Sequence, residues 1–245
     1  MIKVIGHRGA KALAPENTIA GIKAGIAAGV DGIEFDIKMT KDKQFVLSHD
    51  DSLLRLWNIN AKISELDFQQ LKKLTTKAGR TIETLSDALE NIGDTPAIIE
   101  AKGDGWARLL ANYLHNHPKK SLCTVIAYNH RELFIFGQNC PNVPLYGLER
   151  FNSAEALNNA RIFGFDGIDL NFLGLNPLVY WLARRRKLSV VAYNINYVWL
   201  AKMLRFLYPS LIMTTNIPHK LQFLRPRRLR VKHGTHQLPR IHRRK

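Results

Sequence analysis

Cysteine is scarce in this chain of 245 residues, which contains only Cys123 and Cys140. Small extracellular domains that rely on disulfides carry many more cysteines for their length. Cys123 falls in a predicted strand and Cys140 stands directly before a proline, so the pair does not indicate a disulfide framework. We therefore expect a reducing, cytoplasmic setting.

Long apolar runs are also lacking. The hydrophobic content of 46% is ordinary for a globular core, but charged residues interrupt the apolar stretches before they reach the length that crosses a bilayer. The first residues, Met1 to Val4, lead directly into a predicted strand and its glycine-containing turn, which is unlike a signal peptide. These features favour a globular domain over a membrane-spanning protein.

Acidic residues are outnumbered, because 20 Asp and Glu stand against 36 Lys and Arg and give a net charge of +16. Nine of the basic residues and no acidic residue fall between Arg225 and Lys245, which leaves +7 for the preceding 224 residues. That last segment has no helical or strand periodicity, and its composition predicts disorder. We expect one folded domain over residues 1–224 and a basic tail over residues 225–245.

The function of such a tail is open, because it can be simply solvated or can contact an anionic membrane or a nucleic acid. The segment from Leu221 to Val231 mixes apolar and basic residues. This mixture favours weak contact with a membrane surface over a specific nucleic-acid partner.

Short β-rich runs alternate with amphipathic segments along the body of the chain, as is typical of a parallel sheet flanked by helices. The predicted strands are Lys3–Gly6, Ile33–Lys38, Gln44–Ser48, Ala97–Ala101, Cys123–Ala127, Val143–Leu148, Gly167–Leu170, Ser189–Tyr193 and Leu211–Thr214. The predicted helices are Thr18–Ala28, Ser64–Thr75, Gly105–His115, His130–Gln138, Ala154–Phe163, Pro177–Arg186 and Tyr197–Leu207. One helix-to-strand turn occurs twice, at residues 29–34 and 164–169.

One of the nine predicted strands cannot be parallel to its neighbour. Only a short turn around Thr40 to Lys43 joins Ile33–Lys38 to Gln44–Ser48, whereas a parallel crossover needs about a dozen residues or more. The remaining eight strands predict an α/β fold, a (β/α)₈ TIM barrel with an antiparallel hairpin arm after strand 2. Only a short insertion, between Asp51 and Leu85, precedes strand 3.

Two carboxylates, Glu34 and Asp36, alternate on the second predicted strand and therefore face the same side. Burial of two such groups is costly without compensating charge, and paired carboxylate oxygens favour a divalent cation. The hairpin should return His49 beside Glu34, at the C-terminal ends of the strands where barrel enzymes place their catalytic groups. The alternative is a core network in which Arg and Lys pair with the acids.

A set of motifs follows this pattern in order: His7-Arg8-Gly9-Ala10, Pro15-Glu16-Asn17-Thr18, Gly32-Ile33-Glu34-Phe35-Asp36-Ile37, Thr40-Lys41-Asp42, His49-Asp50-Asp51, Ile99-Glu100-Ala101-Lys102 and Ala192-Tyr193-Asn194-Ile195-Asn196. In order and spacing the set resembles the glycerophosphodiester phosphodiesterase family. The resemblance spans residues 1 to about 220 and is strongest before residue 103. It implies a barrel enzyme that hydrolyses a small glycerophosphodiester to an alcohol and sn-glycerol 3-phosphate.

The resemblance also implies roles for single residues. Glu34, Asp36 and Glu100 would bind one divalent cation, Mg²⁺ or Ca²⁺, and His7 and His49 would form a general acid and base pair. The residues implied in phosphate or substrate binding are Arg8, Lys102, Glu16, Asn17, Tyr193 and Asn196. Arg8 and Lys102 can equally balance the charge of the acids, and Asn17 can simply cap the helix that follows it.

The chain departs from the family pattern at two places, because Tyr193 and Asn194 replace the usual Trp and Thr, and Asn216 replaces the usual Asp. These changes concern the choice of substrate more than catalysis. Two alternatives to the phosphodiesterase remain. One is a related enzyme that removes the head group of a lysophospholipid at a membrane surface. The other is a non-catalytic barrel whose tail binds a polyanion.

Overall fold

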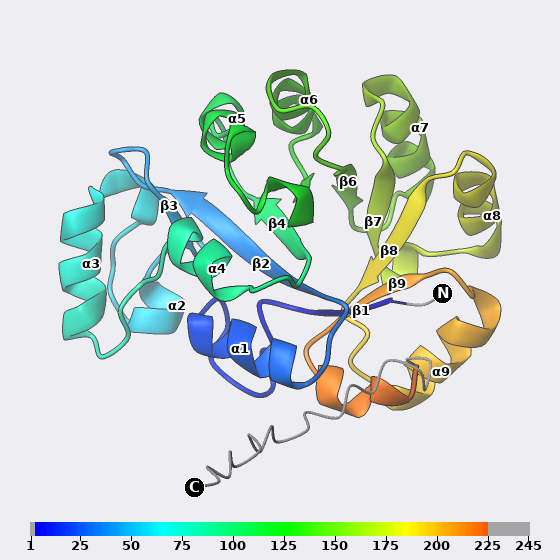
Figure 1. Cartoon of the computed structure of the whole chain (residues 1–245), viewed down its shortest axis with the longest axis horizontal. Coiled ribbons are helices and arrows are strands. Elements are labelled where there is room, and N and C mark those ends of the chain that lie inside the picture. Colours follow the sequence, from blue (N-terminus) through cyan, green and yellow to red (C-terminus); the bar gives the residue numbers. More distant parts are fainter. Residues whose placement is uncertain (1–2, 225–245) are drawn as a thin grey trace, which may run out of the picture.

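The computed structural model describes residues 3–224 and contains one sheet of nine strands. Strand β1 pairs in parallel with both β2 and β9, and parallel pairing continues from β2 through β4 to β9, so eight strands close into a ring (Figure 1). The strands are β1 (Lys3–Gly6), β2 (Gly32–Met39), β3 (Phe45–Leu47), β4 (Ala97–Ala101), β5 (Cys123–Ala127), β6 (Leu145–Glu149), β7 (Gly167–Asn171), β8 (Ser189–Tyr193) and β9 (Ile212–Thr215). The predicted (β/α)₈ TIM barrel is confirmed.

Helices connect the strands and lie outside the ring (Figure 1). The α-helices are α1 (Ile19–Ala27), α2 (Leu54–Trp57), α3 (Phe68–Lys77), α4 (Leu85–Asn91), α5 (Ala107–His115), α6 (His130–Asn139), α7 (Ser153–Phe163), α8 (Pro177–Arg185) and α9 (Val198–Leu207). Short 3₁₀ helices are η1 (Ile63–Glu65), η2 (Lys120–Leu122), η3 (Phe172–Gly174), η4 (Pro218–Lys220) and η5 (Gln222–Leu224). No helix within residues 3–224 is both long and apolar enough to cross a membrane. The predicted basic tail, residues 225–245, lies outside the described residues.

The hairpin arm is present as predicted. Strand β3 pairs antiparallel with β2, Ile37 facing Leu47, and lies outside the ring. The chain after β3 forms a small lobe of α2, η1 and α3 at one flank of the barrel (Figure 1). Trp57, Ile63 and Leu71 form part of its own apolar cluster, so the insertion packs on itself and on β3.

Helix α3 begins later than predicted. The sequence pattern predicts a helix from Ser64, but the helix begins at Phe68. The Ser64 hydroxyl instead donates a hydrogen bond to Asp51 Oδ2 (2.7 Å), which holds this residue in η1. Asp67 is the N-cap, and its backbone N–H donates to Gln70 Oε1 (3.1 Å). Helix α4, absent from the prediction, starts with a capping box between Thr84 and Asp87.

Alternation along the strands separates two kinds of surroundings. On β2, Ile33, Phe35 and Ile37 point outward into the cluster between the sheet and the helices, whereas Glu34 and Asp36 point into the barrel. Inside the ring, a smaller apolar cluster is formed by Ile5, Ile98, Ile126 and Leu148. Below the polar side chains at the C-terminal ends of the strands, apolar side chains therefore pack the interior of the barrel.

Gly9 provides a test of how the turn after β1 is built. Its φ of +89° and a Cβ position only 2.5 Å from the carbonyl carbon of Gly21 leave no room for a side chain against α1. Gly79 has a similar φ of +82° but open space around it. Gly79→Ala should therefore cost only about 1–2 kcal/mol of unfolding free energy, and Gly9→Ala should cost about 1–3 kcal/mol more because the backbone must shift. Urea unfolding of both variants measures the difference, and equal losses would contradict it.

Candidate active site

A pocket of about 660 Å³ opens at the C-terminal ends of the barrel strands. The sequence-predicted residues on its wall are His7, Arg8, Glu34, His49, Glu100, Lys102 and Tyr193. The other predicted residues stand behind this wall: Glu16 and Asp36 contact its cations, Asn17 binds Asp36, and Asn196 binds Asn216. The structure thus brings together groups that are up to 186 positions apart in the chain, from His7 to Tyr193.

Three carboxylates meet at one side of this pocket. Glu34 and Asp36 come from β2, and Glu100 of β4 stands opposite Asp36 in the parallel register. One oxygen from each lies within 4.8 Å of the others, and exposed fractions are 3%, 0% and 8% in chain order. Oxygen atoms gathered in this way can coordinate a divalent cation.

The charges of this cluster are only partly balanced by the protein. Burial and the charge of Asp36 raise the pKa of Glu34 well above its usual range and the pKa of Glu100 to about 7. Burial alone would also raise the pKa of Asp36, but Lys102 and Arg8 lower it to about 2. Glu34 Oε1 is buried without a hydrogen-bond partner. An unpartnered carboxylate oxygen among competing negative charges fits a bound divalent cation.

Arg8 and Lys102 supply the positive charge beside the acids. Lys102 Nζ lies 3.2 Å from Asp36 Oδ1 and also forms an ion pair with Glu100. Arg8 Nε lies 3.4 Å from Asp36 Oδ2, and its backbone N–H donates to Glu34 Oε2 (2.8 Å). Both side chains also reach the pocket wall, so charge balance and phosphate binding are compatible roles.

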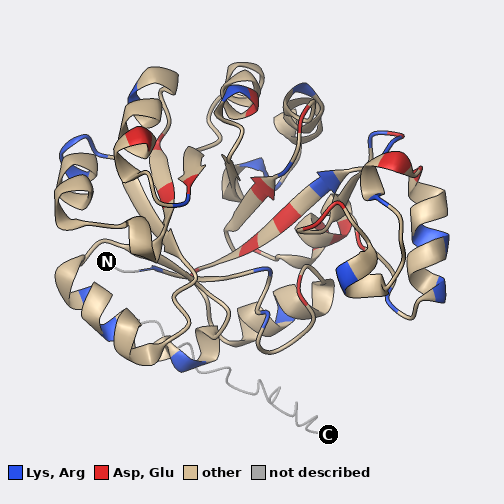
Figure 2. Cartoon of the chain, turned by 180° about the vertical axis from the view of Figure 1, so that it is seen from behind, with Lys and Arg blue, Asp and Glu red and all other residues tan. Residues whose placement is uncertain are grey.

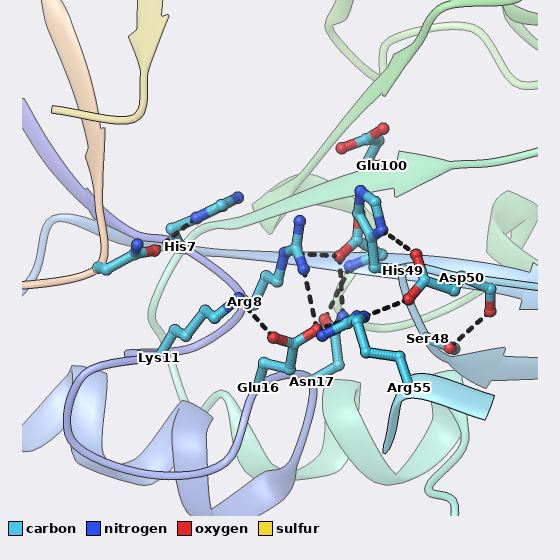
Figure 3. A network of polar contacts seen from close by, with 12 residues as sticks. His7, Arg8, Lys11, Glu16, Asn17, Ser48, His49, Asp50, Arg55 and Glu100 are labelled. Carbon is cyan, nitrogen blue, oxygen red and sulfur yellow. Dashed lines mark hydrogen bonds and ion pairs between the residues drawn. The ribbon is translucent and has the colours of Figure 1, made fainter. Parts of the chain in front are cut away.

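Glu16 lies behind the pocket wall and binds three cationic side chains (Figure 3). Its carboxylate accepts from Arg8 Nη1 (2.8 Å) and Arg55 Nη2 (2.6 Å), and Lys11 Nζ lies 2.6 Å away. Burial raises the pKa of Glu16, but hydrogen bonds from Arg55 and Lys11 outweigh this and keep the pKa far below its usual range. The residue therefore remains charged and orients Arg8 toward Asp36.

Asn17 contacts Asp36 and does not cap the following helix. Its Nδ2 donates to Asp36 Oδ2 (2.8 Å), and its Oδ1 accepts from the backbone N–H of Asp36 (3.0 Å). Thr18 is the N-cap of α1, because its Oγ1 accepts from Gly21 N (3.0 Å). Of the two roles expected for Asn17, the structure supports the active-site hydrogen bond.

His7 is held in place by Asn216, which follows the last strand, β9. Its Nδ1 lies 2.6 Å from Asn216 Oδ1, and its Nε2 lies 3.9 Å from Glu34 Oε2. With the carboxamide oxygen as acceptor, Nδ1 carries the proton and Nε2 is left with its lone pair toward the pocket. Burial, reinforced by Arg8, lowers the pKa of His7 to about 4, so the ring is neutral at pH 7. Asn196 supports His7 indirectly, because its Oδ1 accepts a hydrogen bond from the backbone N–H of Asn216 (2.8 Å).

His49 is held by a carboxylate. Its Nδ1 lies 2.6 Å from Asp50 Oδ1, and Asp50 in turn forms an ion pair with Arg55 (Figure 3). His49 and Glu34 both line the pocket, and the residue before His49, Ser48, donates its backbone N–H to the Asp36 carbonyl (3.2 Å) at the end of the hairpin. Burial lowers the pKa of His49, and the charge of Asp36 opposes this effect.

The far wall of the pocket contains residues that sequence reasoning missed, among them Tyr128, Arg150 and Asp169. Tyr128 and Tyr193 share a hydrogen bond between their hydroxyls (2.9 Å). Asp169 is buried on β7, with Oδ1 lacking a partner. The repeated turn could have found it, because residue 169 ends the second copy where Glu34 ends the first.

Two other residues illustrate what the sequence did not reveal. Arg55, on α2, carries no motif of its own, yet it links Glu16 to Asp50. Trp57 lies two positions later, at the end of α2. It is buried in the lobe, with the Arg80 guanidinium 5.3 Å from its ring centroid.

Comparison with known proteins agrees with this geometry. A glycerophosphodiester phosphodiesterase of Caldanaerobacter subterraneus is 37% identical over 103 residues, which cover 39% of this chain and 42% of that protein. YhdW of Bacillus subtilis, a protein provisionally named as a glycerophosphodiester phosphodiesterase, is 27% identical over 209 residues, 79% of this chain and 86% of its own length.

A solved structure shares the fold. The Oleispira antarctica phosphodiesterase in complex with the product sn-glycerol-3-phosphate superposes with a TM-score of 0.82 at 22% identity, covering 91% of this chain and 96% of that one. The glycerophosphoryl diester phosphodiesterase family model matches residues 7–139, which is more than half of the chain. The chain therefore belongs to the glycerophosphoryl diester phosphodiesterase family, a family of hydrolases.

Proposed function

We propose that this chain hydrolyses glycerophosphodiesters to an alcohol and sn-glycerol 3-phosphate, with one divalent cation, Mg²⁺ or Ca²⁺. The observation that carries the proposal is the meeting of three buried carboxylates, two histidines and two cationic side chains at one pocket. The product bound to the Oleispira antarctica phosphodiesterase supports a small-molecule substrate. A non-catalytic barrel would have no need for this arrangement of groups.

The cation would be held by Glu34, Asp36 and Glu100, where an unpartnered oxygen and raised pKa values favour it. When bound, it would polarise the phosphodiester and offset the negative charge that develops there. Arg8 and Lys102 reach the same wall of the pocket and would bind phosphate oxygens, Arg8 through its planar guanidinium and Lys102 as a point charge.

The hydrogen bonds of the histidines suggest which is base and which is acid. His7 presents an unprotonated Nε2, because Asn216 holds the proton on Nδ1, and is suited to take a proton from the nucleophile. His49 donates to the carboxylate of Asp50, which opposes the lowering of its pKa by burial, and is suited to give a proton to the leaving alkoxide.

The nucleophile is either a water molecule or the 2-hydroxyl of the substrate's own glycerol. A glycerophosphodiester carries that hydroxyl next to the ester, so it is already positioned when Arg8 and Lys102 hold the phosphate. We favour this internal attack, which would form a cyclic phosphate that water then opens.

The metal can be tested by removal and by mutation. We expect a chelator to abolish turnover of glycerophosphocholine and excess Mg²⁺ or Ca²⁺ to restore it. The reason is that the cation held by Glu34, Asp36 and Glu100 would bind the phosphate. Glu100→Gln should lose most activity and bind the metal more weakly in calorimetry. Glu65→Gln, at an exposed position of η1, serves as the control. Full activity in chelator would disprove metal dependence.

The histidines should affect the rate without affecting the metal. His7→Ala and His49→Ala should each lower kcat by about 10²- to 10⁴-fold while calorimetric metal binding stays normal. The wild-type rate should also show a bell-shaped dependence on pH, since one group must be deprotonated and the other protonated. His115→Ala, on the outer helix α5, is the control. Unchanged kcat in either site variant would remove that histidine from the mechanism.

Internal attack makes a separate prediction about substrate chemistry. A substrate without the 2-hydroxyl should still bind but should be cleaved orders of magnitude more slowly. The reason is that a hydroxyl already oriented next to the phosphate reacts as if it were present at a very high concentration. Competition against the normal substrate measures binding, and product release measures the rate. Cleavage at the normal rate would favour direct attack by water and would leave the roles of the metal ligands unchanged.

A further inference from the structure

Helix α9 and its neighbours expose large apolar side chains to solvent. Trp199 is 63% exposed and Phe206 is 87% exposed, although side chains of this size are usually buried. We define the aromatic face as the exposed residues Trp181 of α8, Tyr197, Trp199, Met203 and Phe206 at or on α9, and Phe223 of η5. These elements are neighbours, because Tyr180 of α8 packs on Tyr208 at the end of α9 with ring centroids 4.8 Å apart.

The apolar residues of α9 lie on two opposite sides of the helix. Leu200, Ala201 and Leu204 are buried against the barrel and account for its packing. Trp199, Met203 and Phe206 follow one another at spacings of four and three residues, so they share the side that faces solvent. A helix that is apolar on both sides normally has a partner on each. The outer side of α9 is not needed for the fold.

The charge of this region has one sign. From Leu170 to Leu224 the sequence contains seven Lys and Arg but no Asp or Glu. Two of the cations accompany the aromatic face directly, since the Arg185 guanidinium lies 4.7 Å from the Trp181 ring centroid and Lys202 Nζ lies 5.5 Å from that of Phe223. In Figure 2 the α9 region shows basic but no acidic residues.

We propose that the aromatic face docks on the surface of an anionic phospholipid bilayer, with α9 lying in the plane of the interface. Exposed Trp and Tyr beside Lys and Arg is the composition that favours the boundary between head groups and acyl chains. The absence of acidic residues adds attraction to anionic lipids. A second copy of the chain is a poorer partner, because two such faces would bring like charges together without an acid between them.

The position of α9 relates this surface to the pocket. The helix follows β8, whose last residue, Tyr193, lines the pocket. Tyr197 and Trp199 are at the start of α9, near that end of the barrel. Docking would therefore hold one edge of the pocket close to the lipid head groups.

Vesicle binding of the full chain tests the proposal. The probes are vesicles of phosphatidylcholine alone and of phosphatidylcholine mixed with phosphatidylglycerol, measured by co-sedimentation. We expect binding to the mixed vesicles, and Phe206→Ser should weaken it about tenfold or more, because the lost apolar contact is comparable to burial of one large side chain. Ile162→Ser is the matched control, since Ile162 is 58% exposed on α7, outside the aromatic face. The basic residues 225–245 are present in every variant.

A second measurement reports the depth of insertion. Brominated acyl chains should quench tryptophan emission of the wild type, Trp199→Ser should reduce this quenching, and Trp181→Ser combined with Trp199→Ser should remove most of it. Turnover of a soluble glycerophosphodiester and the urea midpoint should stay within error in Phe206→Ser, which shows that the variant is folded.

Three results would overturn the proposal. One is no binding of the wild type to the mixed vesicles. Another is equal binding of Phe206→Ser and wild type, which would assign the contact to basic residues alone. The third is a dimer in sedimentation that Phe206→Ser dissociates, which would assign the face to a second copy.

Discussion

The buried carboxylate of Asp36 is the constraint on which the rest of the site depends. A charged group with no exposed surface must be compensated from several directions, and here Asn17, Arg8 and Lys102 each supply contacts to it. These three residues come from the loop after β1 and from the end of β4. Stabilising one charge therefore fixes the relative positions of three neighbouring strands.

The same compensation extends outward to the two histidines. Glu16 holds Arg8 and Arg55, and Arg55 holds Asp50, which orients His49. His7 is held separately, through Asn216 near the last strand of the ring. The two histidines consequently have different hydrogen-bond partners, an amide oxygen for one and a carboxylate for the other, which suits them to different roles in proton transfer.

Prediction from sequence succeeded where chemistry and spacing both pointed to one answer. The alternation of strands and helices, with the short hairpin set aside, predicted the barrel, and the resemblance of the motifs to a known family implied one wall of its pocket. It failed where a residue's role depends on a distant partner. Ser64 has the spacing of a helix cap but is held by Asp51, and Arg55 has no motif although it bridges two acids. Asn196 is close to the pocket yet supports Asn216 rather than lining the wall.

The sequence by itself determined the order of the strands and of most helices, the shared direction of Glu34 and Asp36 and the surplus of basic residues, because period, turn length and composition are local properties. Only the tertiary structure decided that Asn17 binds Asp36 while Thr18 caps α1, since both residue types suit either role. It likewise decided which side of α9 is covered. The helix is apolar on both sides, and closure of the barrel buries Leu204 while leaving Phe206 in solvent.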